Sequence, residues 1–490
     1  MTDYPFKTIP FSHQAKTFAE TRNQTGFCVH WEQGCGKSKL VVDTAAWLFL
    51  GGKINGGVVV APNGVHANWR DNELPAHLPD RVAAATRCHV WDSKKAKSKA
   101  AQADFQDVLN HKGFAWLMMG YGALVTDAAK DALFKFLTQR RCVMTLDESA
   151  RIKNPKAERT RALMALRLLP AYRRSLTGTP ISQTPFDFYA QIEWVFPGYW
   201  KSNGFGSFTA FKHYFGEWER RKDSMGRQYE TLKQCVNLPE LGRLVRPISS
   251  RVVKKDVLDL PPKVYKILSY DMSPEQKRLY KSLKSEFVAF INSDDVTSGA
   301  ISAEMAITRM MRMQQVTLGY VQLDGEDSIT DLKDNPRLDL LADMVEDMGT
   351  DQCLIWARYR RDVDKIMRLL GNRAVKIDGS VAQADRAAAV AAIQAGDKQF
   401  FVGTPAAAGE GWTMTAASQT IYYSNSYRLG DRLQSEDRNH RIGQKNKVTY
   451  TDIVARGSMD RAIIRALRGK KNISDIVLGD EVNTWLKEED

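Results

Sequence analysis

Short apolar segments recur along two stretches of the chain, and segments with helical spacing of apolar residues lie between them. The strand-like segments of the first stretch are Gly26–Trp31, Gly57–Ala61, Cys142–Leu146 and Arg174–Thr177. Those of the second stretch are Cys353–Trp356, Ala374–Ile377, Phe400–Gly403, Thr420–Tyr423 and Val448–Val454. Strands that alternate with helices along the sequence are typical of parallel sheets. The pattern therefore predicts an α/β protein with two parallel-sheet lobes.

Between the two stretches, from Phe196 to Asp334, the pattern is largely helical. Apolar residues gather here in an aromatic and then a methionine group: Phe205, Phe208, Phe211, Tyr214, Phe215 and Trp218, then Met305, Met310, Met311 and Met313. The methionines could form a partner-binding surface, but we favour packing inside a helical insertion. We expect a first lobe at 1–250 with an insertion at about 196–245, a linker and second helical insertion at 251–334, and a second lobe with C-terminal helices at 335–490.

Length and charge are consistent with this division. The chain has 490 residues, and single cores rarely grow beyond roughly 250–300 residues. With 43% hydrophobic and 26% charged residues it has the composition of an ordinary globular protein. Seventy Lys and Arg against 57 Asp and Glu give a net charge of +13, which weakly favours a polyanionic partner.

Neither a metal-binding spacing nor a targeting segment is apparent. The six cysteines include no C-x-x-C pair and the eight histidines no metal-spaced pair, so we expect reduced thiols and no structural metal. Met1–Pro10 lacks a basic region followed by an apolar run, and no stretch approaches the ~18 apolar residues of a membrane helix. We expect a soluble cytoplasmic protein, bacterial or in an infected host cell, that is neither secreted nor bound to a membrane.

A glycine-rich loop, Gly34-Cys35-Gly36-Lys37-Ser38, follows the first strand-like segment and precedes a helical one, Lys39–Leu50. Backbone amides at such a loop and helix N-terminus bind phosphate, with Lys37 reaching the β- and γ-phosphates and Ser38 ligating Mg²⁺. The full motif G-x-x-x-x-G-K-[ST] is not met, because Trp31 occupies the first glycine position. A bare G-K-[ST] arises by chance in roughly one such chain in four, but the strand-turn-helix context favours a phosphate site.

Two adjacent carboxylates, Asp147 and Glu148, directly follow the apolar segment Cys142–Leu146. Ligands of open α/β sheets bind at the carboxyl ends of the strands. An isolated Asp-Glu pair is usually a solvated turn, but the preceding strand and the upstream loop favour a functional pair here. We expect Asp147 to hold Mg²⁺ through water and Glu148 to orient and deprotonate the attacking water.

Four segments, three in the first stretch and one that follows it, resemble motifs of superfamily 2 helicases, and within them of the Swi/Snf-like translocases. Met144–Lys156, which reads M-T-L-D-E-S-A-R-I-K-N-P-K, resembles the family's D-E-A-H-x-I-K-N segment. Ser175–Ile181 is similar to its L-T-G-T-P-I motif, and Val59–Pro62 with Asn68-Trp69 resembles its first DNA-contacting motif. Arg251–Lys263 resembles the linker by which the chain crosses to the second lobe.

The second stretch carries the most specific likeness. Gln434–Gln444 reads Q-S-E-D-R-N-H-R-I-G-Q and is similar to the family's Q-A-x-D-R-x-H-R-I-G-Q. Gly409-Glu410-Gly411, followed by Met414–Ala417, resembles the preceding motif. The likeness runs in the family's order from Gln14, in the position of the adenine-reading glutamine, to about Leu478.

The resemblance implies two RecA-like lobes of the P-loop NTPase type, with ATP and Mg²⁺ as ligands and no other small-molecule substrate. It assigns catalysis to Lys37, Asp147, Glu148, Arg438 and Arg441, and nucleotide binding to Gln14, Gly34, Cys35, Gly36, Lys37, Ser38, Gly409, Gly411 and Gln434. When the lobes close, Arg438 and Arg441 would meet the γ-phosphate. Their spacing of three predicts that they share one helical face.

The resemblance implies that the partner is DNA, double-stranded or branched. The protein would contact its sugar-phosphate backbone, which carries no sequence information. The side chains expected to contact it are Asn68, Lys153 and Asn154 in the first lobe and Arg358 and Thr404 in the second. For each of these residues a solvated surface side chain is the alternative.

Two kinds of departure from the family pattern stand out. Ala150 occupies the position where the family usually has His or Gln, a side chain that couples the nucleotide site to the second lobe. Trp31, Gln33 and Trp412 also replace commoner residues. None of these changes removes a charge that hydrolysis requires.

Three functions are compatible with the sequence: a duplex-DNA translocase that remodels DNA or displaces bound protein, a strand-separating helicase, and a binding module without hydrolysis. We favour the translocase, since the charged residues for hydrolysis are all present and only Ala150 supports the binding module. Because Ser458–Asp480 resembles the family's closing helices, we expect no histone-reading domain and favour a compact factor of replication, repair or recombination.

Overall fold

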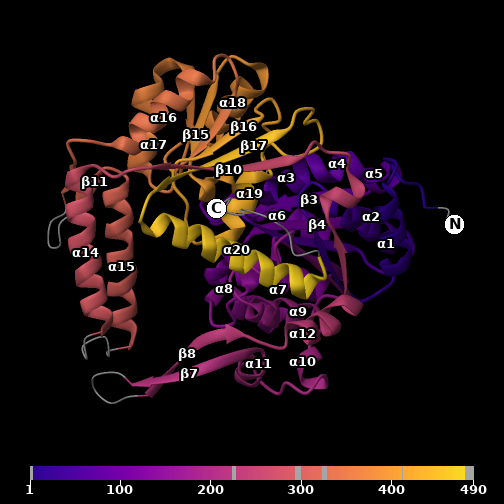
Figure 1. The fold of residues 1–490 in the computed structure, drawn as a ribbon. Helices are drawn as coiled ribbons and strands as arrows, with labels where there is room; N and C mark the ends of the chain where they lie inside the picture. The colour runs from indigo at the N-terminus through magenta and orange to yellow at the C-terminus, as the bar shows by residue number, and fades with distance from the viewer. Residues whose placement is uncertain are drawn as a thin grey trace. The chain divides into compact units, whose positions relative to one another are not determined.

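The computed structural model describes residues 4–63, 65–222, 228–292, 299–322, 328–410 and 412–480. These divide into two compact units. Lobe one is formed by the described parts of Met1–Phe215, Val236–Asp259 and Ile473–Glu481, and lobe two by those of Gly216–Cys235 and Leu260–Asn472. Each lobe has its own sheet (Figure 1) and its own core.

Lobe one contains a seven-stranded parallel sheet in the order β3-β4-β2-β5-β6-β1-β9. The strands are β1 (Gly26–Trp31), β2 (Gly56–Ala61), β3 (Thr86–Val90), β4 (Phe114–Gly120), β5 (Cys142–Asp147), β6 (Tyr172–Leu176) and β9 (Ser249–Val252). Every residue of β1, β2 and β4 is buried, as in parallel sheets that are covered on both faces. This explains why these strands read as continuous apolar runs.

Most helices of lobe one connect these parallel strands, whereas α1 precedes the first strand and α13 follows the last (Figure 1). They are α1 (Ser12–Thr21), α2 (Lys37–Leu50), α3 (Val65–Asn68), α4 (Leu74–His77), α5 (Asp80–Ala84), α6 (Lys99–Asn110), α7 (Asp127–Gln139), α8 (Glu158–Leu166), α9 (Phe188–Val195), α10 (Tyr199–Ser202), α11 (Phe208–Phe215), α12 (Leu238–Val245) and α13 (Lys254–Val257). Short 3₁₀ turns follow β4 at Tyr121–Val125 and β5 at Ser149–Ile152. The carboxyl ends of β5, β6 and β1 lie next to one another because these strands are neighbours in the sheet.

Lobe two contains a six-stranded parallel sheet in the order β10-β17-β16-β13-β15-β14. The strands are β10 (Lys263–Tyr270), β13 (Cys353–Trp356), β14 (Ala374–Ile377), β15 (Phe400–Gly403), β16 (Gln419–Tyr422) and β17 (Val448–Ala455). The larger helices are α14 (Pro274–Asn292), α15 (Gly299–Thr317), α16 (Pro336–Asp347), α17 (Arg360–Leu370), α18 (Gln383–Ala395), α19 (Leu429–Glu436) and α20 (Met459–Leu478).

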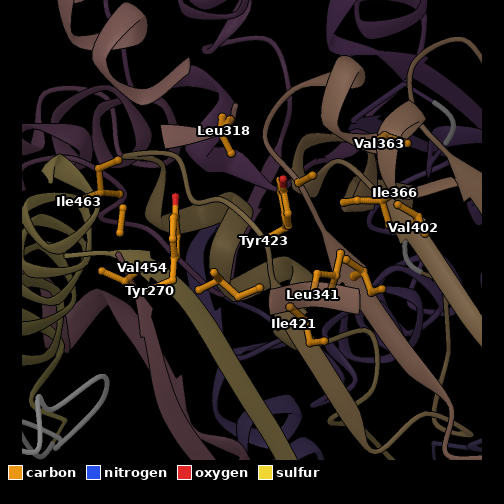
Figure 2. Close-up of a cluster of buried hydrophobic side chains, with 14 of the residues drawn as sticks. Tyr270, Leu318, Leu341, Val363, Ile366, Val402, Ile421, Tyr423, Val454 and Ile463 are labelled. Carbon is orange, nitrogen blue, oxygen red and sulfur yellow. The ribbon is translucent and has the colours of Figure 1, made fainter. Parts of the chain in front are cut away.

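Alternate residues of the lobe-two strands enter different cores. Ile355 and Val402 belong to one cluster, which includes Ile421, Tyr423 and residues of α16 and α17 (Figure 2). Trp356, one position after Ile355, belongs to a second cluster. Because side chains alternate along a strand, the sheet is apolar on both faces and needs helices on both.

The stretch between the predicted lobes is less uniformly helical than its pattern suggested. An antiparallel hairpin of β7 (Gly216–Lys222) and β8 (Gln228–Cys235) occupies part of the predicted helical insertion. The first four residues of β8, Gln228–Thr231, alternate between more and less exposed positions, which is the strand period and not the helical one. A second antiparallel pair, β11 (Tyr320–Gln322) and β12 (Ile329–Asp331), follows α15.

The structure also shows the state of the cysteines and the packing of two methionines. All six cysteines are free thiols, and burial raises the pKa of the Cys28 and Cys142 thiols to about 12. Met313 is buried in the lobe-two core and Met310 packs against it, in agreement with the packing interpretation. Among the helices that the structure describes, none has the length and apolar character that a membrane span needs.

Candidate functional site

The glycine-rich loop lies between β1 and α2 and has the backbone that phosphate binding requires. Gly34 and Gly36 adopt φ values of 83° and 78°, which glycine tolerates and other residues rarely do. Gly36 precedes the first residue of α2, Lys37, so amides of the first helical turn without intrahelical acceptors face this loop. A Cβ added to Gly36 would approach Nε2 of Gln14 to 2.0 Å. The loop therefore depends on glycine both for its conformation and for space.

The start of α1 is attached to this loop by two side chains. The Gln14 amide donates from Nε2 to the Gly36 carbonyl at 3.1 Å, and its Oε1 accepts from the Phe11 amide at 2.8 Å. Nε2 of His13 lies 2.9 Å from the Cys35 carbonyl. These contacts bring Gln14, from a distant part of the sequence, to the edge of the phosphate loop.

Lys37 and Ser38 occupy the first turn of α2, and both are half-buried. Nζ of Lys37 donates to the carbonyls of Trp31 at 3.0 Å and Glu32 at 3.3 Å, so the side chain folds back across the loop. Those carbonyls are weak partners for an ammonium compared with a phosphate oxygen. The geometry therefore leaves Lys37 able to exchange these acceptors for an anion.

Asp147 is the last residue of β5 and is held by two aromatic side chains. Nε1 of Trp69 donates to its Oδ2 at 3.0 Å, and the Tyr121 hydroxyl donates to its carbonyl at 2.9 Å. Burial and the adjacent charge of Glu148 raise the pKa of Asp147 to about 7, although the Trp69 hydrogen bond and the charge of Lys37 act in the opposite direction. Two carboxylates confined side by side in this way favour a divalent cation between them and a phosphate.

Glu148 has a left-handed backbone, with φ 52° and ψ 54°, a conformation uncommon for a residue with a side chain. Its Oε2 accepts from the Thr177 hydroxyl at 3.2 Å and its Oε1 from Nε2 of Gln33 at 3.3 Å. Both oxygens are thus oriented, one by the residue after β6 and the other by the phosphate loop. A carboxylate fixed in this manner beside a phosphate site can orient and deprotonate water.

The 3₁₀ turn that contains Ala150 is joined to the segment after β6 by neighbouring side chains. The buried Ser149 hydroxyl donates to Oε1 of Gln191 at 2.9 Å, and Nε2 of Gln191 donates to the Pro180 carbonyl at 2.9 Å. Ala150 itself offers only a methyl group. Beyond the pairing of β5 with β6, the side chains of Ser149 and Glu148 therefore link the acidic pair to the segment after β6.

The three DNA-contact candidates of lobe one lie in different local surroundings. Nδ2 of Asn68, at the end of α3, donates to Glu73 at 3.3 Å. Nζ of Lys153 donates to the Ser182 hydroxyl at 2.6 Å. Asn154 is exposed, and its Oδ1 accepts from the Lys156 amide at 3.0 Å in a local turn. The structure does not bring these three side chains together into one cluster of contacts, and their role in DNA binding stays a prediction.

In lobe two, Arg358 follows β13 and donates to Oε1 of Gln314. Thr404 follows β15, and its carbonyl accepts from the Ala407 amide at 2.9 Å. Both therefore lie at the carboxyl edge of the lobe-two sheet, where the strand neighbours β13 and β15 end together. Gly409 lies in a 3₁₀ turn, Pro405–Glu410, and Gly411 lies outside the described residues.

Arg438 and Arg441 do not share a helical face, because α19 ends at Glu436. They lie in the irregular turn that follows, which is fixed by the amides of Asn439 and Gln444. Even so, the Nη1 atoms of both arginines converge on the Trp412 carbonyl, each at 3.2 Å. Nε of Arg438 also donates to the Gln434 carbonyl at 3.0 Å. Arg438 is only 2% exposed, whereas Arg441 is half-buried.

Three contacts of the acidic pair were not predicted as parts of the site. Trp69, Tyr121 and Thr177 bind Asp147 or Glu148 directly, and Gln33, which departs from the family pattern, binds Glu148 as well. Trp69 and Thr177 lie in segments that resemble family motifs, so the sequence indicated that both residues are functional. It did not say which atoms meet, because these residues are brought together by the order of the strands.

Comparisons with known protein families show the family of the chain. Residues 13–318 match the family described as SNF2-related domain, and residues 336–443 match the helicase conserved C-terminal domain. The chain is 30% identical over 487 residues to the DNA annealing helicase and endonuclease ZRANB3 of Mus musculus, an alignment that covers 96% of this chain and 41% of that protein.

A bacterial relative is similar over the same range. The putative ATP-dependent helicase/translocase YwqA of Bacillus subtilis (strain 168) is 24% identical over 481 residues, covering 94% of this chain and 47% of the relative. The chain thus spans less than half the length of these two curated relatives. A solved structure, the Sulfolobus solfataricus SWI2/SNF2 ATPase core in complex with dsDNA, aligns at 20% identity with a TM-score of 0.41, over 98% of this chain and 96% of that chain.

Proposed function

This chain belongs to the SNF2-related domain family, and on that premise we propose that it is a DNA-dependent ATPase that uses ATP hydrolysis to move along DNA. The observation that carries the proposal is Glu148, whose two carboxylate oxygens are held by Gln33 of the phosphate loop and by Thr177. Such orientation is required of a general base in phosphoryl transfer and is costly to maintain without a function.

The phosphate loop supplies the binding half of the mechanism. The amides that follow Gly34 and Gly36 would cradle the phosphates of ATP, and Lys37 would leave the Trp31 and Glu32 carbonyls for a phosphate oxygen. Gln14, which already contacts the loop, is proposed to bind the adenine. A phosphate oxygen is a charged acceptor and binds the Lys37 ammonium more strongly than these neutral carbonyls do, so nucleotide binding favours the exchange.

Mg²⁺ suits the oxygen donors present at this site. The Ser38 hydroxyl and the Asp147 carboxylate would hold it, Asp147 through water, and the raised pKa of Asp147 reflects a buried negative charge that a divalent cation would compensate. When bound, the ion neutralises charge on the phosphates. Glu148 would accept the proton of the attacking water, while Gln33 and Thr177 keep its oxygens directed.

Arg438 and Arg441 are proposed to stabilise the charge that develops on the γ-phosphate, and Gly409, Gly411 and Gln434 to contribute to nucleotide binding. Backbone contacts from Asn68, Lys153, Asn154, Arg358 and Thr404 would let each ATP cycle advance the protein along DNA without reading its sequence. The net charge of +13 favours such a polyanionic track.

The proposed track is duplex DNA, plain or branched, and its use is to remodel DNA structures or displace bound protein. Steady-state ATPase rates with double-stranded and single-stranded DNA of equal length test this. We expect greater stimulation by the duplex, a steep fall with salt because the contacts are to phosphate, and ATP-dependent displacement of a triplex-forming third strand.

Strand separation is the competing function, and a simple tailed duplex distinguishes the two. A translocase should unwind it poorly, whereas stimulation by single strands alone together with efficient unwinding would identify a helicase. A forked substrate is unsuitable for this comparison, because a motor that only pulls on one duplex arm can also unwind a fork. Glu148→Gln serves as the control for ATP-independent strand exchange.

A further inference from the structure

Lobe two carries a strongly basic helix face that the proposed mechanism does not use. Lys277, Arg278, Lys281 and Lys284 of α14 are all exposed. Lys277, Lys281 and Lys284 follow the i, i+4, i+7 spacing that places side chains along one face of a helix. Figure 1 shows α14 beside α15 as an antiparallel pair within the lobe.

These cations have no acidic partners in the part of lobe two that the structure describes, where no ion pair joins any of the four to a carboxylate. On α17 of the same lobe, by contrast, Arg361 and Lys365 both bind Asp331. Like charges three and four residues apart also destabilise a helix. An external anion bound along this row of three lysines would relieve their mutual repulsion.

The opposite face of α14 is firmly anchored, so the basic face is presented in a fixed orientation. Ser273 and Gln276 form a reciprocal capping box at the start of the helix, with bonds of 2.9 and 3.2 Å. Nε2 of the fully buried Gln276 donates to the Val316 carbonyl at 2.9 Å, which ties α14 to the end of α15. The buried Tyr280 hydroxyl accepts from the Met459 amide at 2.8 Å.

We propose that the Lys277, Lys281 and Lys284 face of α14 binds the phosphate backbone of DNA, as a contact additional to those at the carboxyl edge of the lobe-two sheet. Seven residues of helix span about 10 Å, and duplex DNA carries one negative charge per roughly 1.7 Å of its axis. A row of three lysines of that length can therefore meet several phosphates at once. This inference rests on the proposed function, in which DNA is the partner.

Salt dependence of DNA binding tests the proposal, because each phosphate contact adds about 0.9 to the slope of log affinity against log salt. We would measure the binding of a fluorescent duplex to the full chain and to the triple variant Lys277→Gln, Lys281→Gln and Lys284→Gln. The slope should fall by about 2.7, so that a fourfold rise in salt weakens the variant about 40-fold less than the unchanged chain.

A matched control removes the same net charge elsewhere. Lys112, Lys135 and Lys201 are exposed lysines of lobe one, none of which is joined to a carboxylate in the described part of the chain. The triple Gln variant of these control lysines should keep the slope within about one unit of that of the unchanged chain. A variant with Arg in place of the three α14 lysines should also have the slope of the unchanged chain, because it keeps their charge. Far-ultraviolet circular dichroism confirms that each variant is folded, and ATPase activity without DNA should be the same in all.

The possible outcomes separate this proposal from the proposed function. Equal slopes for the α14 and control variants would overturn the DNA contact at α14, and would also be the result if the face binds an acidic protein. Duplex stimulation of the unchanged chain would persist in that case. An unchanged chain that binds no duplex and shows no stimulation would overturn both proposals.

Discussion

The Gln33 side-chain amide and the Glu148 carboxylate meet at 3.3 Å, which joins the phosphate loop to the carboxylate we propose as general base. Both Gln33 and Ala150 depart from the family pattern. Gln33 replaces a residue that is more common in the family at that position, and Ala150 replaces the His or Gln that couples the nucleotide site to the second lobe. Through this hydrogen bond, a residue next to the phosphate loop orients the Glu148 carboxylate.

Replacing Gln33 with Met should lower kcat by about 10- to 100-fold, since a hydrogen bond to a charged group contributes roughly 1.5–3 kcal/mol. The KM for ATP should change little, because Lys37 and the loop amides are untouched. Gln33→Glu should be more severe, since a second carboxylate beside Glu148 raises the pKa of the pair, and its pH–rate profile should shift to higher pH. Steady-state ATPase kinetics check both, and a Gln33→Met variant with the original kcat would contradict the role.

Lys37→Ala should abolish ATP turnover, whereas Glu148→Gln should retain ATP binding and hydrolyse it very slowly. The difference follows from their places: Lys37 lies on the loop that would hold the phosphates, and Glu148 is held beside it by Gln33 and Thr177. Fluorescent-nucleotide binding and single-turnover hydrolysis distinguish the two variants. Wild-type turnover in Lys37→Ala would show that the phosphate-loop assignment is wrong.

The two arginines of the turn after α19 should behave differently on substitution. Arg441 is half-buried, and Arg441→Ala should lower kcat by about 10³-fold or more, as loss of an arginine finger does, with a smaller effect on ATP affinity. Arg438 is 2% exposed and donates to both Trp412 and Gln434, so Arg438→Ala should also lower the thermal stability. Near-normal kcat with lost nucleotide affinity in Arg441→Ala would exclude the proposed role.

Ala150 gives a prediction about coupling. If its methyl group weakens the dependence of hydrolysis on DNA, the unchanged chain should show appreciable ATPase activity without DNA, and Ala150→His should increase the ratio of stimulated to basal rate. Ala150→Ser is the control, because it adds a polar atom without the reach of His. An identical ratio in all three proteins would remove this explanation.

Stability of lobe two should depend on pH through Glu436. Burial raises the pKa of this carboxyl, but Lys263 and Arg432 outweigh that effect and lower it from 4.5 to about 2. A lowered pKa contributes stability that is present above pH 4.5 and is lost as pH falls towards 2. Glu436→Gln should therefore lower the free energy of unfolding by about 1.5–3 kcal/mol at pH 7, because Lys263 and Arg432 lose a charged acceptor, while Arg432 keeps its ion pair with Asp452.

Denaturant unfolding at several pH values checks this prediction. The difference in stability between the unchanged chain and Glu436→Gln should be constant from pH 7 to about pH 5 and should shrink below pH 4.5. Glu346→Gln, on the surface-exposed side of α16, is the matched control and should show no such difference. A gap that persists unchanged at pH 3 would contradict the assignment.

The sequence by itself determined the two parallel-sheet lobes and the position of the phosphate loop. These follow from local patterns, since strands such as β13 and β15 are buried on both faces and so read as uninterrupted apolar runs. Glycine at 34 and 36 is likewise a local requirement, because only a residue without a side chain readily adopts their backbone angles. Asp147 and Glu148 could be placed at a strand end because they directly follow the apolar run Cys142–Leu146.

Tertiary structure alone decided which side chains meet at that strand end. Glu148 is separated from Gln33 by 115 residues and from Thr177 by 29, and only the strand order β5-β6-β1 makes their carboxyl ends neighbours. The β7–β8 hairpin and the turn that carries Arg438 and Arg441 also escaped the local pattern. Long-range hydrogen bonds such as those of Asn439 and Gln444 override helical spacing there, and such bonds are properties of the folded chain.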